Sequence, residues 1–222
     1  MVEPEINILD DPSGAVAELL ASAARRGETI GLTGGHSVGE AYERAAALEP
    51  DWSRAEVWWG DERCVPPEDE RSNFLLAQRT LLNNLERPPE VHRIRGELEP
   101  ELAALEYDEA LEGVQLDVKL LGLGPDAHVA SLFPGSPQLA ERERRATSGP
   151  AGLEPFVDRV TMTLPMILSA RRLVFLITGA DKTDAVQRVF RDPVNEAAPG
   201  SLLRLGDTPI VAYLDRDAAG QS

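Results

Sequence analysis

An apolar run at residues 116–121, which leads into a glycine-rich stretch at 122–135, constrains the fold of this chain more than any other feature. A short apolar run before such a turn indicates a strand buried on both faces, as in a parallel sheet. Open parallel sheets bind ligands beyond the carboxyl ends of their strands. The stretch also holds Asp126 two residues before His128, a pairing that suits acid–base chemistry on a small molecule. Spacing alone favours a plainer interpretation, a loop histidine that caps the next helix.

The rest of the chain alternates helical and extended patterns. Apolar spacing predicts helices over residues 11–26, 37–48, 72–85, 100–111 and 182–190, and strands over 28–33, 55–59, 91–94, 158–163, 173–178 and 209–214. We expect polar loops over 60–67 and 134–155. Strands that alternate with helices favour a mostly parallel sheet with helices on both faces. We therefore expect a single open α/β domain over residues 1–222.

Composition narrows the class of partner. A net charge of −16 argues against nucleic acid, because a phosphate-binding surface needs a basic face. No apolar run approaches the ~20 residues that a membrane helix needs. The single Cys64 excludes an intrachain disulfide, and the acidic N-terminus lacks a signal-peptide core. We expect a cytoplasmic protein with a small-molecule partner, bound to neither nucleic acid nor membrane.

A first candidate site for an anion follows the predicted strand at 28–33. Gly34 and Gly35 leave backbone N–H groups open to an anion, and the helix start after Ser37 adds partial positive charge. A plain tight turn is an equally good interpretation. The segment has neither the Gly-Lys-Ser/Thr of a P-loop nor the Gly-x-Gly-x-x-Gly of a dinucleotide site.

Other charged residues lie near predicted strand ends. Asp61 and Arg63 follow the strand at 55–59, where a surface salt bridge is the simpler interpretation. Lys182 stands at a predicted helix start, where a cation opposes the helix dipole and a bound anion would relieve the conflict. Lys119, the other lysine, lies inside a strand pattern. Arg159 precedes its strand end, so its placement is the least defined.

The carboxyl ends of parallel strands meet at one edge of a sheet, so these separate loops can converge. Convergence would combine the Asp126–His128 pair with basic groups that hold an anion. Each signal is weak alone, and together they predict a site for a small anionic substrate.

Taken in order, six segments resemble the 6-phosphogluconolactonase family, which shares its fold with glucosamine-6-phosphate deaminase and ribose-5-phosphate isomerase. They are LTGG at 32–35, GDERCVP at 60–66 with SN at 72–73, GLGPDAHVASLFPG at 122–135, RVTMT at 159–163, TGADK at 178–182 and YLD at 213–215. The resemblance spans nearly the whole chain. The ASLFP at 130–134 is specific to the lactonase branch.

The resemblance implies hydrolysis of 6-phosphogluconolactone in the pentose phosphate pathway, with neither metal nor organic cofactor. His128 is then the general base that takes a proton from water, and Asp126 orients it. The resemblance implies that the substrate and its phosphate are held by Gly34, Gly35, Ser37, Asp61, Arg63, Arg159 and Lys182. The group that stabilises the oxyanion is left open between Arg63 and backbone N–H groups.

The chain departs from the family pattern at two positions. Ala127 stands where relatives usually have glycine, and a positive φ there would cost roughly 1 kcal/mol or more. His36 lies in the glycine-rich loop, where it contacts phosphate or faces solvent. Two other functions stay open: a sugar-phosphate isomerase or deaminase of the same fold, and a sugar-phosphate sensor without catalysis. The Arg142–Arg145 cluster either flanks the site or lies on a solvated loop.

Overall fold

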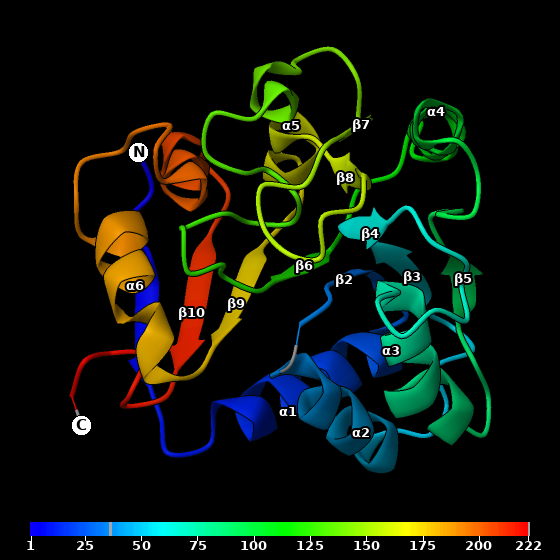
Figure 1. Ribbon diagram of the computed structural model, residues 1–222. Coiled ribbons are helices and arrows are strands. Elements are labelled where there is room, and N and C mark those ends of the chain that lie inside the picture. The colour runs from blue at the N-terminus through cyan, green and yellow to red at the C-terminus, as the bar shows by residue number, and fades with distance from the viewer. Residues whose placement is uncertain (36, 222) are drawn as a thin grey trace.

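The computed structural model, which describes residues 1–35 and 37–221, is built around a parallel sheet whose chain path reverses at its middle (Figure 1). The strands lie in the order β1 (Glu5–Ile8), β10 (Ile210–Leu214), β9 (Leu173–Ile177), β6 (Val118–Leu121), β2 (Thr29–Leu32), β3 (Glu56–Trp59) and β5 (Glu90–His92). From β2 the chain moves outward to β3 and β5, and from β6 it moves the other way to β9 and β10. The reversal between β2 and β6 is where such sheets open a crevice for ligands.

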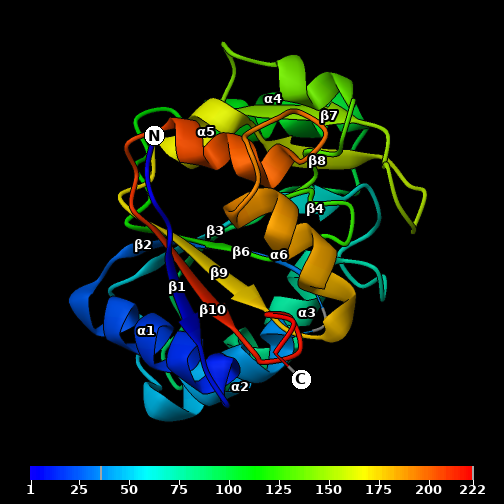
Figure 2. The same ribbon diagram turned by 90° about the vertical axis from the view of Figure 1, so that its left-hand side faces the viewer.

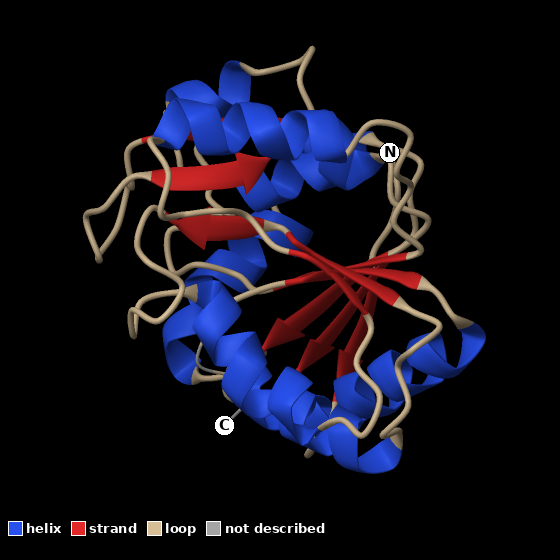
Figure 3. Ribbon diagram, turned by 90° about the vertical axis from the view of Figure 1, so that its right-hand side faces the viewer, coloured by secondary structure: helices blue, strands red, loops and turns tan. Residues whose placement is uncertain are grey.

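Helices cover both faces of this sheet, as Figure 3 shows, which confirms the expected architecture. Three helices lie together on one face: α1 (Pro12–Arg26), α2 (Val38–Leu48) and α3 (Asn73–Thr80). Figure 2 shows α4 (Pro100–Ala110) and α5 (Leu164–Leu168) on the other side. The last helix, α6 (Thr183–Phe190), sets Phe190 edge-on against Phe175 of β9, with ring centroids 5.2 Å apart. Four 3₁₀ turns complete the described helical elements: η1 (Leu82–Asn84), η2 (Pro137–Ala140), η3 (Ala180–Lys182) and η4 (Pro199–Leu205).

A second, antiparallel sheet lies above the main one and was not expected from the sequence (Figure 3). Its strands lie in the order β4 (Asp61–Arg63), β8 (Arg159–Met162) and β7 (Ala146–Gly149). The prediction of loops throughout 60–67 and 134–155 is therefore wrong at β4 and β7. Both strands are short and carry polar or charged residues, so no apolar alternation marks them.

The local sequence accounts for the elements that position the site. Every residue of β6 and β9 is buried, as a central parallel strand requires. Helix α1 begins where Asp11 Oδ1 accepts a hydrogen bond from Gly14 N–H at 2.9 Å, with Pro12 in the tolerated first turn. The hydrophobic core includes Trp52 and Trp59, both fully buried. Within the described residues, no helix is long and apolar enough to cross a membrane.

Candidate active site

A cavity of about 770 Å³ lies at the carboxyl ends of β2, β6 and β9, beside β4 and β8 of the small sheet. The sequence-predicted residues that line it are Gly34, Gly35, Ser37, Asp61, Arg63, His128, Arg159 and Lys182. The structure thus brings together loops that are up to about 150 residues apart, at the edge where parallel strands end. Asp126 stands behind this wall, against the ring of His128.

His128 and Asp126 form a hydrogen-bonded pair. His128 Nδ1 lies 2.5 Å from Asp126 Oδ1, and the His128 backbone N–H donates to the same oxygen at 3.2 Å. Burial raises the pKa of the Asp126 carboxyl, but the hydrogen bonds and charge of His128 outweigh burial and hold this pKa below its ordinary value. An ionised carboxylate only accepts hydrogen bonds, so Nδ1 carries the proton. Nε2 of the neutral ring is left as an acceptor, which is the form that a general base needs.

The turn that carries the pair is strained at Ala127. Its φ is +71°, the left-handed region that the sequence marked as costly for alanine. Backbone hydrogen bonds hold it there: Ala127 N–H donates to Gly124 O, and Ala127 O accepts from Gly200 N–H, each at 2.9 Å. Its buried methyl contributes about 0.8 kcal/mol, which offsets much of the strain. Alanine is therefore tolerated at this position.

Two neighbours fix the imidazole of His128. A Cβ added to Gly124 would lie 1.9 Å from Nδ1 of His128, so this close approach requires glycine. The ring of Phe133 packs against the imidazole, with ring centroids 4.4 Å apart and ring planes tilted by 44°. Both residues line the cavity with His128. The ring is thus held by packing as well as by Asp126.

The loop after β2 presents backbone and hydroxyl groups to the cavity. Gly35 has a φ of +115°, a conformation that side chains disfavour. Ser37 precedes α2, and its hydroxyl forms a short hydrogen bond with that of Thr178 from the β9 end. Among the described residues the Ser37 side chain makes no capping bond to α2, and Ser37, Thr178 and the first residue of α2, Val38, all line the cavity. His36 lies outside the described residues.

Antiparallel pairing sets Arg63 of β4 directly opposite Arg159 of β8. Arg159 is 2% exposed and donates from Nη2 to Pro155 O at 2.8 Å. Its Nε and Nη1, and Nε of Arg63, find no hydrogen-bond partner in the part of the chain that the structure describes. Burial lowers the pKa of the Arg159 guanidinium, and the adjacent charge of Arg63 lowers it further. Like charges with unpartnered N–H groups beside a cavity form an arrangement that a bound anion would stabilise.

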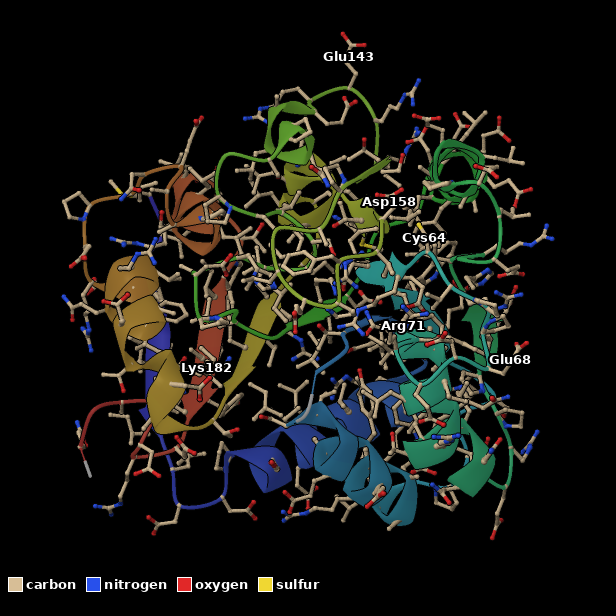
Figure 4. The ribbon with its side chains drawn as sticks, in the orientation of Figure 1. Cys64, Glu68, Arg71, Glu143, Asp158 and Lys182 are labelled. Atoms are coloured by element: carbon tan, nitrogen blue, oxygen red, sulfur yellow. The ribbon has the colours of Figure 1, made fainter. Side chains whose placement is uncertain are left out.

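Lys182 reaches the cavity from the connection after β9 (Figure 4). Lys182 was expected just inside a helix start, but it ends the 3₁₀ turn η3, and α6 begins at Thr183. Its Nζ lies 3.0 Å from Oδ2 of Asp181, whose side chain is exposed whereas that of Lys182 is partly buried. Asp215 holds this connection by accepting from Gly179 N–H at 2.9 Å. Lys182 is therefore placed to reach an anionic ligand.

Sequence reasoning placed Asp61 in the site but missed its two partners in the cavity wall. Asp61 is 7% exposed and accepts a hydrogen bond from Ser131 Oγ at 2.7 Å. Nδ2 of Asn73 donates to Asp61 O at 2.9 Å. Both partners lie in the segments that carry the family resemblance, Asn73 after the polar loop and Ser131 after His128. Their only sequence signal was membership in those segments.

Two other features lie outside the site. No residue of the Arg142–Arg145 cluster is among the described cavity walls, and Figure 4 shows Glu143 projecting from the loop tip, far from Lys182. Among residues 1–35 and 37–221, no group of three or more His, Cys, Asp or Glu side chains is placed to hold a metal ion.

Comparison with known proteins decides the family. The family model for glucosamine-6-phosphate isomerases and 6-phosphogluconolactonase matches residues 10–211. The chain belongs to this family. A family member from Mycobacterium tuberculosis named 6-phosphogluconolactonase is 36% identical over 242 residues, which cover 98% of this chain and 96% of that relative.

Solved structures of the family share the fold. A 6-phosphogluconolactonase from Thermotoga maritima superposes with a TM-score of 0.85 at 26% identity, covering 96% of this chain and all of that one. A monomeric glucosamine-6-phosphate deaminase superposes with a TM-score of 0.87 at 18% identity, over 100% of both chains. The second likeness shows the fold alone. It confirms the expected deaminase-like architecture.

Proposed function

We propose that the protein hydrolyses 6-phospho-D-glucono-1,5-lactone to 6-phospho-D-gluconate, the lactone-opening step of the oxidative pentose phosphate pathway. The family and the relatives named for this activity support the assignment. One structural observation carries it: a histidine poised as a base by Asp126 shares a cavity with arginine N–H groups that have no partner among the described residues. The first serves water activation, and the second serves an anionic substrate.

The reaction follows from the arrangement of His128, whose Nδ1 is hydrogen-bonded to Asp126 and whose Nε2 can accept a proton. Nε2 takes a proton from water as the water oxygen attacks the lactone carbonyl, and Asp126 stabilises the imidazolium that forms. The tetrahedral intermediate collapses by breaking the bond to the ring oxygen. The imidazolium returns its proton to that oxygen, which becomes a hydroxyl. Water is thereby added across the ester, and His128 is regenerated.

The basic groups anchor the substrate. We assign the phosphate to the loop of Gly34, Gly35 and Ser37 at the start of α2, with Lys182 beside it. Arg63 and Arg159 supply N–H groups for the carbonyl oxygen as negative charge develops, or for a second anionic contact. Asp61 orients Ser131, and both residues line the same cavity. A fixed anion anchor sets the carbonyl in register with His128.

A substrate panel tests this function. The purified chain is mixed with the phosphorylated lactone, and acid release is compared with the spontaneous rate. Ammonia release from glucosamine 6-phosphate is measured in parallel. We expect accelerated lactone opening and no ammonia. Ammonia release would identify a deaminase, and binding of 6-phosphogluconate without lactone opening would identify a sensor.

Two further proposals, on the cellular location and on the domain organisation of residues 1–222, follow from this function. A cytoplasmic enzyme, formed by one lactonase domain over residues 1–222, suits a phosphorylated metabolite as substrate. Cell fractionation with activity measurement checks the first point. Activity of the chain expressed alone checks the second.

A further inference from the structure

The amino group of Lys119 is buried in the central sheet, outside the set of described residues that line the active-site cavity. Lys119 lies in β6, is 0% exposed, and donates from Nζ to the carbonyl oxygens of Leu32 and Leu120, each at 2.8 Å. Leu32 ends β2, just before the loop of Gly34 and Gly35. Leu120 precedes the turn that leads to His128. The ammonium therefore joins the two strands from which the two main loops of the cavity leave the sheet.

The short pairing between β2 and β6 explains why the Leu120 carbonyl needs a side-chain donor. In the described chain, β2 and β6 pair at two positions, Ile30 with Val118 and Gly31 with Lys119. The N–H of Lys119 bonds to Arg172 O toward β9, so the backbone groups of Leu120 face β2. Beyond Gly31, β2 no longer pairs with β6 in the described chain. The Lys119 ammonium replaces the missing strand donor for the Leu120 carbonyl.

Two glycines make room for this side chain. A Cβ on Gly31 would lie 2.7 Å from Cδ of Lys119, and one on Gly60 would lie 2.2 Å from Nζ. Gly60 also donates its N–H to Leu32 O at 3.0 Å, so β3 is tied to the same carbonyl. The lysine stem thus crosses from β6 over β2 to the end of β3. Three neighbouring strands share one ammonium.

The charged group that acts on this ammonium is Asp61. Burial lowers the pKa of Lys119 to about 7, and the nearby carboxylate of Asp61 opposes that shift. Asp61 lines the cavity and accepts from Ser131, as described above. Lys119 therefore balances the charge of a cavity residue without reaching the cavity itself.

We propose that Lys119 is a positioning residue of the lactonase site, which sets the spacing between the Gly34–Gly35 loop and the Asp126–His128 turn by holding the carbonyls of Leu32 and Leu120. The inference rests on the proposed function. Lys119 is not among the described residues that line the cavity, so it makes no contact with substrate. It contributes through the spacing of the two loops and through the charge next to Asp61.

Two substitutions disturb the ammonium in different ways. Lys119→Met removes it while keeping a similar volume, and Gly60→Ala displaces it. Gly39→Ala is the matched glycine control, since its methyl would lie no closer than 3.5 Å to Leu76 and Thr80. Leu20→Ala, in the buried face of α1, controls for lost stability. We expect kcat/KM for the lactone to fall at least tenfold in the first two variants and to stay within twofold in the controls.

Two results would overturn the proposal: native kcat/KM in Lys119→Met, or an equal loss of activity in Leu20→Ala. Failure of the native chain itself to open the lactone would instead refute the proposed function. The two failures are therefore distinguishable in one set of assays.

A measurement on the native chain avoids any folding defect of the variants. The sequence has two lysines, so ¹⁵N-lysine labelling gives two Nζ signals, Lys119 and Lys182. On saturation with 6-phosphogluconate we expect both signals to shift, Lys182 by contact and Lys119 through Leu32 and Leu120. A shift of Lys182 with an unchanged Lys119 would contradict the positioning role. No shift of either would refute product binding.

Discussion

At the scale of single residues, Arg159 shows a conflict between stability and function. Its guanidinium is buried opposite Arg63, and two of its nitrogens find no partner among the described residues. A buried charge with incomplete pairing destabilises a fold unless a ligand completes it. We infer that Arg159 binds an anionic ligand through the nitrogens that have no partner among the described residues.

The substitution Arg159→Met tests that inference. We expect kcat/KM for the lactone to fall at least tenfold, because the developing oxyanion or a second anionic group of the substrate loses a charge-assisted contact. The free energy of unfolding without ligand should be equal or higher, since burial and Arg63 both oppose the charged form. Steady-state kinetics and urea unfolding measure the two effects. Arg144→Met, on the exposed loop, is the control, and a large loss of stability with unchanged kcat/KM would contradict the assignment.

Asp126 is expected to act on the rate and hardly on substrate affinity. In Asp126→Asn the amide can donate to Nδ1, which favours the ring form with the proton on Nε2 and removes the base. We expect kcat to fall by roughly 10²–10⁴ with KM changed much less. Asp184→Asn, on the exposed side of α6, should behave as the native chain. Equal kcat in Asp126→Asn would show that the carboxylate does not orient the base.

Lys119 also gives a stability prediction with a definite sign. Its folded pKa is about 7, whereas the unfolded chain keeps the ammonium to about 10.4. Between these values the unfolded state binds more protons, so the free energy of unfolding rises as pH increases from about 7 to about 10.4 and falls as pH decreases toward 7. From pH 6 to pH 9 the native chain should gain about 2–3 kcal/mol relative to Lys119→Met. Urea unfolding at both pH values checks this, and a constant difference would contradict the buried ammonium.

At the scale of elements, Glu62 holds the start of α3 against β4. Its carboxylate is 3% exposed and accepts from the backbone N–H groups of Arg63, Asn73 and Phe74 at 2.7–2.8 Å. Burial raises the pKa of Glu62, and these hydrogen bonds oppose that shift. Through this residue, α3 places Asn73 and β4 places Arg63 beside the cavity.

Removing one accepting oxygen should loosen that junction. In Glu62→Gln the amide nitrogen would face backbone donors, which leaves buried N–H groups unsatisfied and lowers unfolding free energy by roughly 1–3 kcal/mol. Thermal or urea unfolding measures the loss. Glu68→Gln is the matched control, since Glu68 projects from the loop before α3 in Figure 4. Equal stability of the two variants would rule out the anchoring role.

Elements with strong periodicity could be predicted from the sequence, and those made by distant pairing could not. Expected helices at 11–26 and 100–111 match α1 and α4 closely, because their apolar spacing and early prolines are local signals. The strand β4 escaped prediction, because Asp61, Glu62 and Arg63 read as a polar loop. It becomes a strand through pairing with β8, about 100 residues later, and such pairing leaves no local pattern.

At the scale of the whole molecule, the topology gathers the site. The carboxyl ends of β2, β6 and β9 meet around the point where the chain path reverses, so residues from six segments line one cavity. The sequence allowed this convergence to be predicted, since parallel strands end at one edge. The contributions of Asn73, Ser131 and Lys119 were not predicted, because their hydrogen bonds cross between elements.

The most direct test of the central claim compares His128→Ala with the native chain on freshly prepared 6-phosphogluconolactone. The rate of acid release is followed at neutral pH and corrected for spontaneous hydrolysis, and binding of 6-phosphogluconate is measured for both proteins. Because the anion anchors stay in place, we predict product binding within a few-fold of native and hydrolysis reduced to near the spontaneous rate. Native hydrolysis by His128→Ala would contradict the account.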